Sequence, residues 1–205
     1  MKQVLRTAAA GLAVCAQMAT ANAQAVRKSY SSGLFVGLGA EGNGIVTRQS
    51  AGGSSSESGG GGGLLVGYGF TPRWSAYLDG SAATIKANGG GNYGLAHFDV
   101  GARVHFRTGP NIVVPFLQFG LSGRAENQTV TSASGTHEYT STGSGIIFGG
   151  GMSAYVTPSF AFSTSVTVAG GTFTHYEIDK QVVSLPSVSA TSSRLHLGAV
   201  WFPRG

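Results

Sequence analysis

The chain has 205 residues, of which 34 are glycine and only 10% are charged. Its formal charge of +5 falls to +3 without the N-terminal Lys2 and Arg6, since 11 basic residues then stand against 8 acidic ones. So small and scattered an excess excludes a nucleic-acid-binding surface, and the regular placement of apolar residues argues against a disordered chain.

The N-terminus has the pattern of an export signal. Lys2 and Arg6 precede an apolar run from Ala8 to about Ala16, and Ala21-Asn22-Ala23 follows as a small-x-small cleavage site. This pattern predicts a signal peptide over residues 1–23 that is removed on export. The run is shorter than the ~18 to 20 apolar residues of a transmembrane helix. The single cysteine, Cys15, lies in the predicted signal, so we expect no disulfide in the mature protein.

After a short periplasmic segment at residues 24–32, eight alternating strands are predicted between Gly33 and Pro203, forming one domain over residues 33–205. Long and short connections alternate strictly along this region. An outer-membrane barrel has this arrangement, with short periplasmic turns, longer extracellular loops and an even strand count. In chain order the predicted connections are Arg48–Gly62, the turn Phe70–Arg73, Lys86–Asn92, the turn Arg107–Pro110, Asn127–Ser144, the turn Val156–Ser159 and His175–Ser193.

The predicted strands have one apolar face and one face of small or polar residues. Phe98 and Val100 fall on one face of the fourth strand, with His97 and Asp99 on the other. A soluble sandwich or lipocalin-like carrier also alternates, but its solvent face would rarely be so rich in glycine. Small residues on the second face suit the narrow, filled interior of an eight-stranded barrel. These glycines are Gly37, Gly39, Gly67, Gly69, Gly101, Gly120, Gly149, Gly151 and Gly198.

Aromatic residues mark the strand ends near the short turns. Amphipathic rings favour the headgroup region of a bilayer, so this placement predicts an interfacial girdle. A ring of ordinary core aromatics is the alternative. The predicted girdle is Phe70, Trp74, Phe106, Phe160 and Trp201.

The chain resembles the small outer-membrane β-barrel family, the OmpA-type and OmpX-type eight-stranded proteins, over nearly all of its mature length. The resemblance is carried by GGLLVGYGFTPRWSAYLDG, by GGGMSAYVTPSFAFSTSV and by the final SRLHLGAVWFPRG. The last segment is similar to the family's assembly signal through Gly198 and Trp201, although it ends in Pro203-Arg204-Gly205 rather than an aromatic residue. The resemblance implies an all-β, antiparallel, up-and-down transmembrane barrel in the outer membrane of a Gram-negative bacterium.

Charged residues on the predicted inner face form the candidate site. Charges in a narrow, low-dielectric lumen are costly unless they are paired. If the third and fourth strands pair about the middle of their loop, Asp79 lies beside Asp99 or Gly101, with Arg103 in diagonal reach. A salt-bridged plug is favoured over a gated ion path, because side chains can fill a barrel of this size. The predicted interior network is Glu41, Asp79, Asp99, Arg103, Arg124 and Arg194.

Other motifs carry less chemistry. Gly37–Gly42 matches the dinucleotide fingerprint, but no helix is predicted to open after it. The five histidines show no metal-ligand spacing. Loop residues His137, Glu138 and His175 could serve a lipid-modifying enzyme, but no sequence context identifies an activated nucleophile. Ala51–Gly62 has almost no apolar residue, which predicts a mobile tether.

The sequence therefore favours a small non-enzymatic barrel with a structural or surface-interaction role. A narrow porin-like channel and a lipid-modifying enzyme remain as alternatives. We expect no cofactor and no metal, a monomer inserted in outer-membrane lipid by the barrel assembly machinery, and any extracellular ligand at the outer loops.

Overall fold

In the computed structural model, residues 32–49, 53–106, 112–132 and 135–203 are described. The predicted signal peptide, nearly all of the predicted periplasmic segment and the Arg107–Pro110 turn lie outside them. Among the described residues, no helix is long and apolar enough to cross a lipid bilayer. The strands are β1 (Gly33–Gln49), β2 (Gly53–Gly69), β3 (Trp74–Lys86), β4 (Asn92–His105), β5 (Val113–Ser132), β6 (Gly135–Thr157), β7 (Phe160–Ile178), β8 (Gln181–Val183) and β9 (Val188–Trp201).

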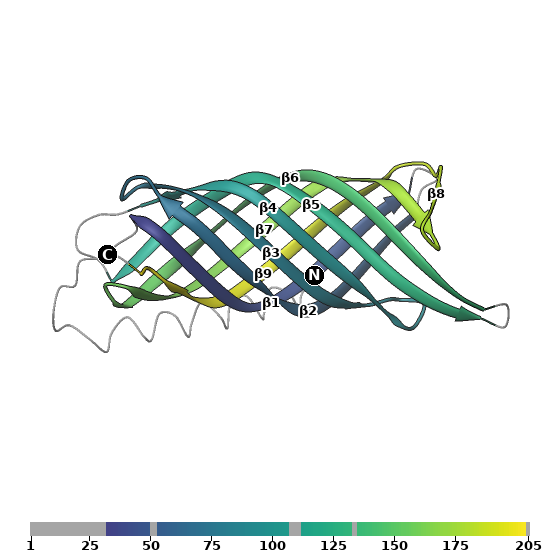
Figure 1. Ribbon diagram of the computed structural model, residues 1–205, viewed down its shortest axis with the longest axis horizontal. Helices are drawn as coiled ribbons and strands as arrows, with labels where there is room; N and C mark the ends of the chain where they lie inside the picture. The colour runs from purple at the N-terminus through teal and green to yellow at the C-terminus, as the bar shows by residue number, and fades with distance from the viewer. Residues whose placement is uncertain (1–31, 50–52, 107–111, 133–134, 204–205) are drawn as a thin grey trace.

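The eight long strands close into a ring, as Figure 1 shows. Each pairs antiparallel with its neighbour from β1 to β7, while β9 lies between β7 and β1. The ninth strand, β8, has three residues and only extends β7 in a small outer hairpin. The predicted eight-stranded up-and-down barrel is confirmed, with this hairpin as an addition.

Over the middle of the wall the two faces lie as predicted, with apolar side chains outward and small or polar ones inward, whereas large apolar side chains such as Phe35 and Ile45 point inward toward the two ends of the barrel. Leu38 is 66% exposed, whereas Glu41 is 6% exposed. Several inward glycines are required by close approach between strands. A Cβ at Gly101 would lie 2.3 Å from the carbonyl oxygen of Phe119, and one at Gly120 would lie 2.2 Å from that of Val100. An outward apolar surface of this extent excludes the soluble lipocalin-like carrier.

Three predicted long loops are wrong, because most of their residues belong to strands. In the first, Arg48–Gly62, the β1–β2 ladder continues to Gln49 and Gly53. The predicted tether at Ala51–Gly62 is therefore wrong for residues 53–62. A strand that has no apolar side chains is still held by its backbone hydrogen bonds. Glycine has no side chain, so this part of β2 can lie close to the neighbouring strand. A Cβ at Gly61 would lie 1.9 Å from the carbonyl oxygen of Ala82.

The second wrong loop is Asn127–Ser144. Here β5 continues to Ser132 and β6 begins at Gly135, so the segment is a long hairpin. Its many threonines favour extended backbone, because a β-branched side chain fits a pleated surface. In the third wrong loop, His175–Ser193, only residues 179–187 separate β7 from β9, with β8 among them, while Lys86–Asn92 is a loop as predicted.

The short turns at the opposite end match the prediction where the structure describes them. In the Phe70–Arg73 turn, the hydroxyl oxygen of Thr71 accepts hydrogen bonds from the backbone N–H groups of Arg73 and Trp74, at 3.2 and 3.0 Å. The backbone N–H of Phe202 donates to the carbonyl oxygen of Ser159 at 2.8 Å, which ties the end of the last strand to the third turn.

Candidate functional site

The predicted interior residues all project into the barrel. Glu41, Asp99, Arg103, Arg124 and Arg194 are buried and Asp79 is half-buried. This layer therefore contains three carboxylates and three guanidinium groups. Formal charge is balanced among these six residues, so the layer does not require a bound counter-ion.

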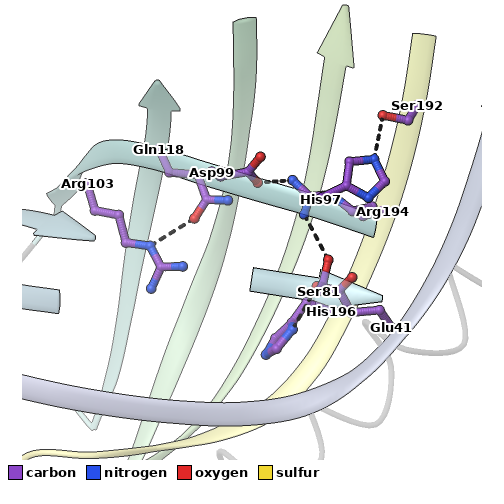
Figure 2. Close-up of polar contacts among 9 residues, drawn as sticks. All are labelled: Glu41, Ser81, His97, Asp99, Arg103, Gln118, Ser192, Arg194 and His196. Atoms are coloured by element: carbon purple, nitrogen blue, oxygen red, sulfur yellow. Dashed lines mark hydrogen bonds and ion pairs between the residues drawn. The ribbon is translucent and has the colours of Figure 1, made fainter. Parts of the chain in front are cut away.

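The central contact of the layer is an ion pair between Asp99 on β4 and Arg194 on β9, both at least 97% buried (Figure 2). Arg194 also donates to the hydroxyl of Ser81 on β3, at 3.3 Å. The pair therefore joins three strands across the lumen. A buried ion pair with further hydrogen bonds offsets part of the cost of removing both charges from water.

A second contact joins β1 and β9 beside this pair. The Nδ1 atom of His196 lies 3.4 Å from the carboxylate oxygen Oε1 of Glu41. Those two residues are direct partners in the β1–β9 ladder. Nearby, the Nε2 atom of His97 lies 3.2 Å from the hydroxyl of Ser192 (Figure 2). Sequence reasoning left His97 and His105 on this face without a role, and the structure places both of them, like His196, against polar or aromatic partners.

Arg103 lies apart from the central ion pair. Asp79 is directly opposite Asp99 in the β3–β4 ladder, as one of the two predicted registers requires. The ion pair of Asp99, however, is with Arg194 rather than with Arg103. Arg103 donates through Nε to the side-chain oxygen of Gln118 at 2.8 Å. Its guanidinium group stacks between two rings, 4.8 Å from the centre of Tyr77 and 4.7 Å from that of Phe116.

Arg124 occupies the outer edge of the polar layer. Its Nη1 atom donates to the carbonyl oxygen of Ala190 at 3.2 Å, and its guanidinium carbon lies 5.5 Å from the ring centre of Phe173. The Arg124 side chain therefore lies between the polar layer and the apolar residues Phe173 and Ala190.

Two apolar clusters enclose the polar layer, one toward each end of the barrel. Along β1 the inward residues run from Phe35 through Glu41 to Ile45, so apolar side chains lie on both sides of the charge. The cluster near the short turns comprises Phe35, Leu65, Tyr77, Val114, Tyr155, Ala161, Val200 and Phe202. The cluster toward the opposite end comprises Ile45, Ala83, Ile85, Tyr93, Leu95, Phe173 and Ala190.

The predicted girdle residues lie on the outer surface near the short turns. Phe70, Trp74, Phe106 and Trp201 are exposed and Phe160 is half-exposed. The Phe160 ring meets that of Phe162 edge to face at 5.5 Å. Exposed apolar side chains continue from this level across the middle of the wall, including Leu38, Phe98, Phe119, Leu121, Ile146, Phe148, Val166 and Leu197.

Beyond this apolar belt, at the end away from the short turns, the strands continue. We call this part, which includes residues 53–62, residues 127–142 and the β7–β8 hairpin, the outer extension. Two polar contacts that the sequence did not reveal hold it together. In the first, the carboxylate of Glu57 on β2 accepts hydrogen bonds from the hydroxyl of Tyr93 at 2.7 Å and from the backbone N–H of Asn88 at 3.1 Å. These bonds fasten β2 to the turn between β3 and β4.

The second contact joins the β5–β6 hairpin to the turn between β7 and β8. The Asp179 carboxylate lies 2.7 Å from the Nδ1 atom of His137 and accepts the backbone N–H of Glu138 at 2.9 Å. Both bonds favour the ionised carboxylate and hold the pKa of Asp179 below its usual value. The His137 contact has the larger effect, and the Glu138 N–H adds to it. Asp179 and Lys180 have positive φ values of 51° and 66°, as a two-residue type I′ hairpin turn requires.

Nucleotide and metal chemistry find no support in the described part of the chain. Gly37–Gly42, the dinucleotide-like motif, lies within β1 rather than before a helix. Where residues are described, no group of three or more histidine, cysteine, aspartate or glutamate side chains could hold a metal ion.

A closed antiparallel barrel with a polar interior and an apolar outer belt defines the class of transmembrane β-barrels. The chain belongs to the outer membrane protein beta-barrel domain family, whose model matches residues 7–198. It is accordingly a protein of the cell outer membrane.

Solved structures of outer-membrane barrels show the same fold. Neisserial surface protein A is 19% identical, with a TM-score of 0.57 over 83% of this chain and 97% of that one. The outer membrane protein OprG from Pseudomonas aeruginosa is 10% identical, with a TM-score of 0.57 over 85% of this chain and 98% of that one. Among curated proteins, no sequence matches.

Proposed function

We propose that this protein is a closed, non-enzymatic barrel with a structural and surface-interaction role, which presents its outer extension to the outside of the cell. The observation that carries the closed lumen is the enclosure of a charge-balanced polar layer between two apolar clusters. A hydrated ion crossing such a lumen would have to pass apolar side chains at both ends, where its lost hydration is not replaced.

The outer extension is the part of the molecule suited to recognition. Its strands continue well past the apolar belt, and the Glu57 and Asp179 contacts fix them to one another. A surface held in one conformation loses less entropy on binding than a mobile loop does. Neisserial surface protein A, a barrel of similar fold, is described as a surface protein, which is consistent with this role.

The contacts of the outer histidines favour a structural role over a lipid-modifying enzyme. The structure places His137 against Asp179 and His175 3.6 Å from Glu177. An enzyme of that kind needs a nucleophile within hydrogen-bond reach of its base. The His137 contact instead holds two hairpins together.

The interior residues act in this proposal as a plug, and Phe70, Trp74, Phe106, Phe160 and Trp201 act as a girdle in the lipid interface. Outer-membrane lipid and the barrel assembly machinery are then its partners during insertion, and the folded barrel is a monomer in its own membrane.

Single-channel recording in planar bilayers tests the closed lumen. We expect the purified wild-type protein to give no stable conductance steps. The quadruple variant Phe35→Ala, Phe202→Ala, Ile85→Ala, Phe173→Ala thins both apolar clusters, and we expect it to conduct. Regular steps from the wild-type protein that grow with salt concentration would establish the porin-like alternative instead.

A further inference from the structure

The β5–β6 hairpin has an open backbone edge at its outer end. Pairing of β4 with β5 ends at Gly94 and Asn127, whereas pairing of β5 with β6 continues to Ser132 and Gly135. Over residues 128–132, β6 pairs with one side of β5, and no described strand pairs with its other side. The hairpin is the part of the wall that projects farthest from the outer end in Figure 1.

This edge lacks the features that usually block pairing with another strand. Natural edge strands carry lysine, proline, bulges or very short lengths to prevent association. The segment from Asn127 to Thr136 contains no charged residue and no proline. Thr129, Val130 and Thr131 at its centre are all exposed. Their β-branched side chains favour the extended backbone that strand addition needs.

The sequence of this edge is complementary to itself in the antiparallel direction. In an antiparallel pair centred on Val130, Thr129 of one copy faces Thr131 of the other, and the two Val130 side chains face each other. Threonine pairs and β-branched pairs directly opposite each other stabilise antiparallel strands. A self-complementary patch is what a two-fold symmetric contact between identical chains requires.

The direction of pairing fixes where the second copy lies. Antiparallel pairing of identical edges places the two-fold axis perpendicular to the sheet, so the two barrel axes point in opposite directions. Two copies in one membrane point the same way. Parallel pairing about an axis along the strand would incline the two barrel axes by about twice the strand tilt of 35 to 45°, which one flat membrane does not permit. The second copy must therefore lie in an opposing membrane.

We propose that the β5 edge at residues 128–132 pairs with the same edge of a second copy of this protein in a facing membrane, so that the protein tethers outer membranes to one another. This inference rests on the surface-interaction role proposed above and names its partner. A five-residue edge spans about 17 Å, so a single contact is weak and transient. Many copies on two facing membranes would act together through avidity.

Vesicle tethering tests this inference. The protein is reconstituted in phosphatidylcholine vesicles carrying one of two lipid dyes, and co-diffusion of the dyes is measured by fluorescence cross-correlation. We expect co-diffusion to rise with protein density and to be absent from protein-free vesicles. Heat-modifiable gel migration confirms that every variant is folded. Wild-type vesicles that never co-diffuse at high density would overturn the inference. If single-channel recording in planar bilayers shows no conductance as well, the proposal of a closed lumen is unaffected.

A charge exchange makes the test specific for the edge. Thr129→Lys with Thr131→Lys sets like charges opposite each other in the antiparallel pair, as does Thr129→Glu with Thr131→Glu. We expect each variant alone to lose co-diffusion to the protein-free level, and a mixture of the two populations to regain it. The variant Thr129→Lys with Thr131→Glu should tether itself, because opposite charges then face each other only when the strands are antiparallel.

The matched control is Ser56→Lys with Ser58→Lys on β2, two exposed positions that add the same charge away from the β5 edge. We expect it to tether like the wild-type protein. Tethering by the doubly lysine-substituted β5 edge, or a mixture of opposite charges that fails to restore it, would show that these strands do not pair.

Discussion

Arg194 supplies the cation for a buried carboxylate that has no access to water. Arg194→Met leaves the Asp99 carboxylate buried without the partner seen in the structure. We expect a loss of about 3 to 5 kcal/mol in the free energy of unfolding. The double variant with Asp99→Asn should lose less, because the uncompensated charge is gone. Urea unfolding in lipid vesicles measures the wild-type protein, both single variants and the double variant, and strictly additive losses would show that the pair is not coupled.

Asp179 is a residue whose ionisation stabilises the outer extension. Its pKa is lower in the folded protein than in the unfolded chain, because His137 and the Glu138 N–H bind the ionised form. The stabilisation is therefore present above the unfolded pKa, about 3.9, and is lost as the pH falls through the lower folded value. We expect spin labels at Thr131 and Val182 to show one narrow distance at pH 7 and a distribution that broadens as the pH is lowered from about 4 through the folded pKa of Asp179.

The Asp179→Ala protein is the control for this pH dependence. It lacks both contacts, so its distance distribution should already be broad at pH 7 and should change little on acidification. A distribution that stays narrow in the Asp179→Ala protein would mean that other contacts hold the two hairpins together.

For a single residue, the sequence predicts which face of the wall its side chain lies on but not which side chain it contacts across the lumen. Period-two alternation places Asp99 and Arg103 on the inner face, and hairpin pairing places Asp79 beside Asp99. The Asp99 partner, Arg194, is 95 positions away on a strand that is not a neighbour of β4. That contact depends on the stagger at which the barrel closes, which no local pattern encodes.

The elements depend on glycine where two strands approach closely. A Cβ at Gly61 would lie 1.9 Å from a carbonyl oxygen of β3, whereas a Cβ at Gly60 would have its nearest contact at 3.6 Å, with the carbonyl oxygen of Glu41. We expect Gly61→Val to destabilise the barrel by about 1 to 3 kcal/mol or more through overpacking, and Gly60→Val to be tolerated. Urea unfolding in vesicles compares the two. Equal stability would show that residues 53–62 form the loop predicted from the sequence rather than a strand.

Strand existence was predictable and strand length was not. Apolar alternation locates every long strand, because it reports the boundary between lipid and lumen. It ends where the wall leaves the apolar belt, near Gly62 and Asn127, although the backbone ladders continue to Gly53 and Ser132. Outside the lipid, a strand needs only a hydrogen-bonding neighbour and a backbone that fits it, and neither gives an apolar pattern.

The whole molecule has two unlike ends, which predict its orientation in the membrane. At one end the strands join through short turns beside exposed aromatic residues, and at the other they run on past the apolar belt. Outer-membrane barrels place the short turns in the periplasm. We therefore expect the outer extension, with the Glu57 and Asp179 contacts and the β5 edge, to face the outside of the cell.

Thiol labelling of intact cells checks this orientation. Single cysteines are placed at Ser56 on β2, at Ser187 between β8 and β9, and at Arg73 in the β2–β3 turn, all exposed positions. We expect an impermeant maleimide to label the Ser56 and Ser187 variants on intact cells, and the Arg73 variant only after the outer membrane is permeabilised. The native Cys15 lies in the predicted signal peptide, so the wild-type protein is the unlabelled control. Labelling of the Arg73 variant alone on intact cells would reverse the orientation and remove the β5 edge from the cell surface.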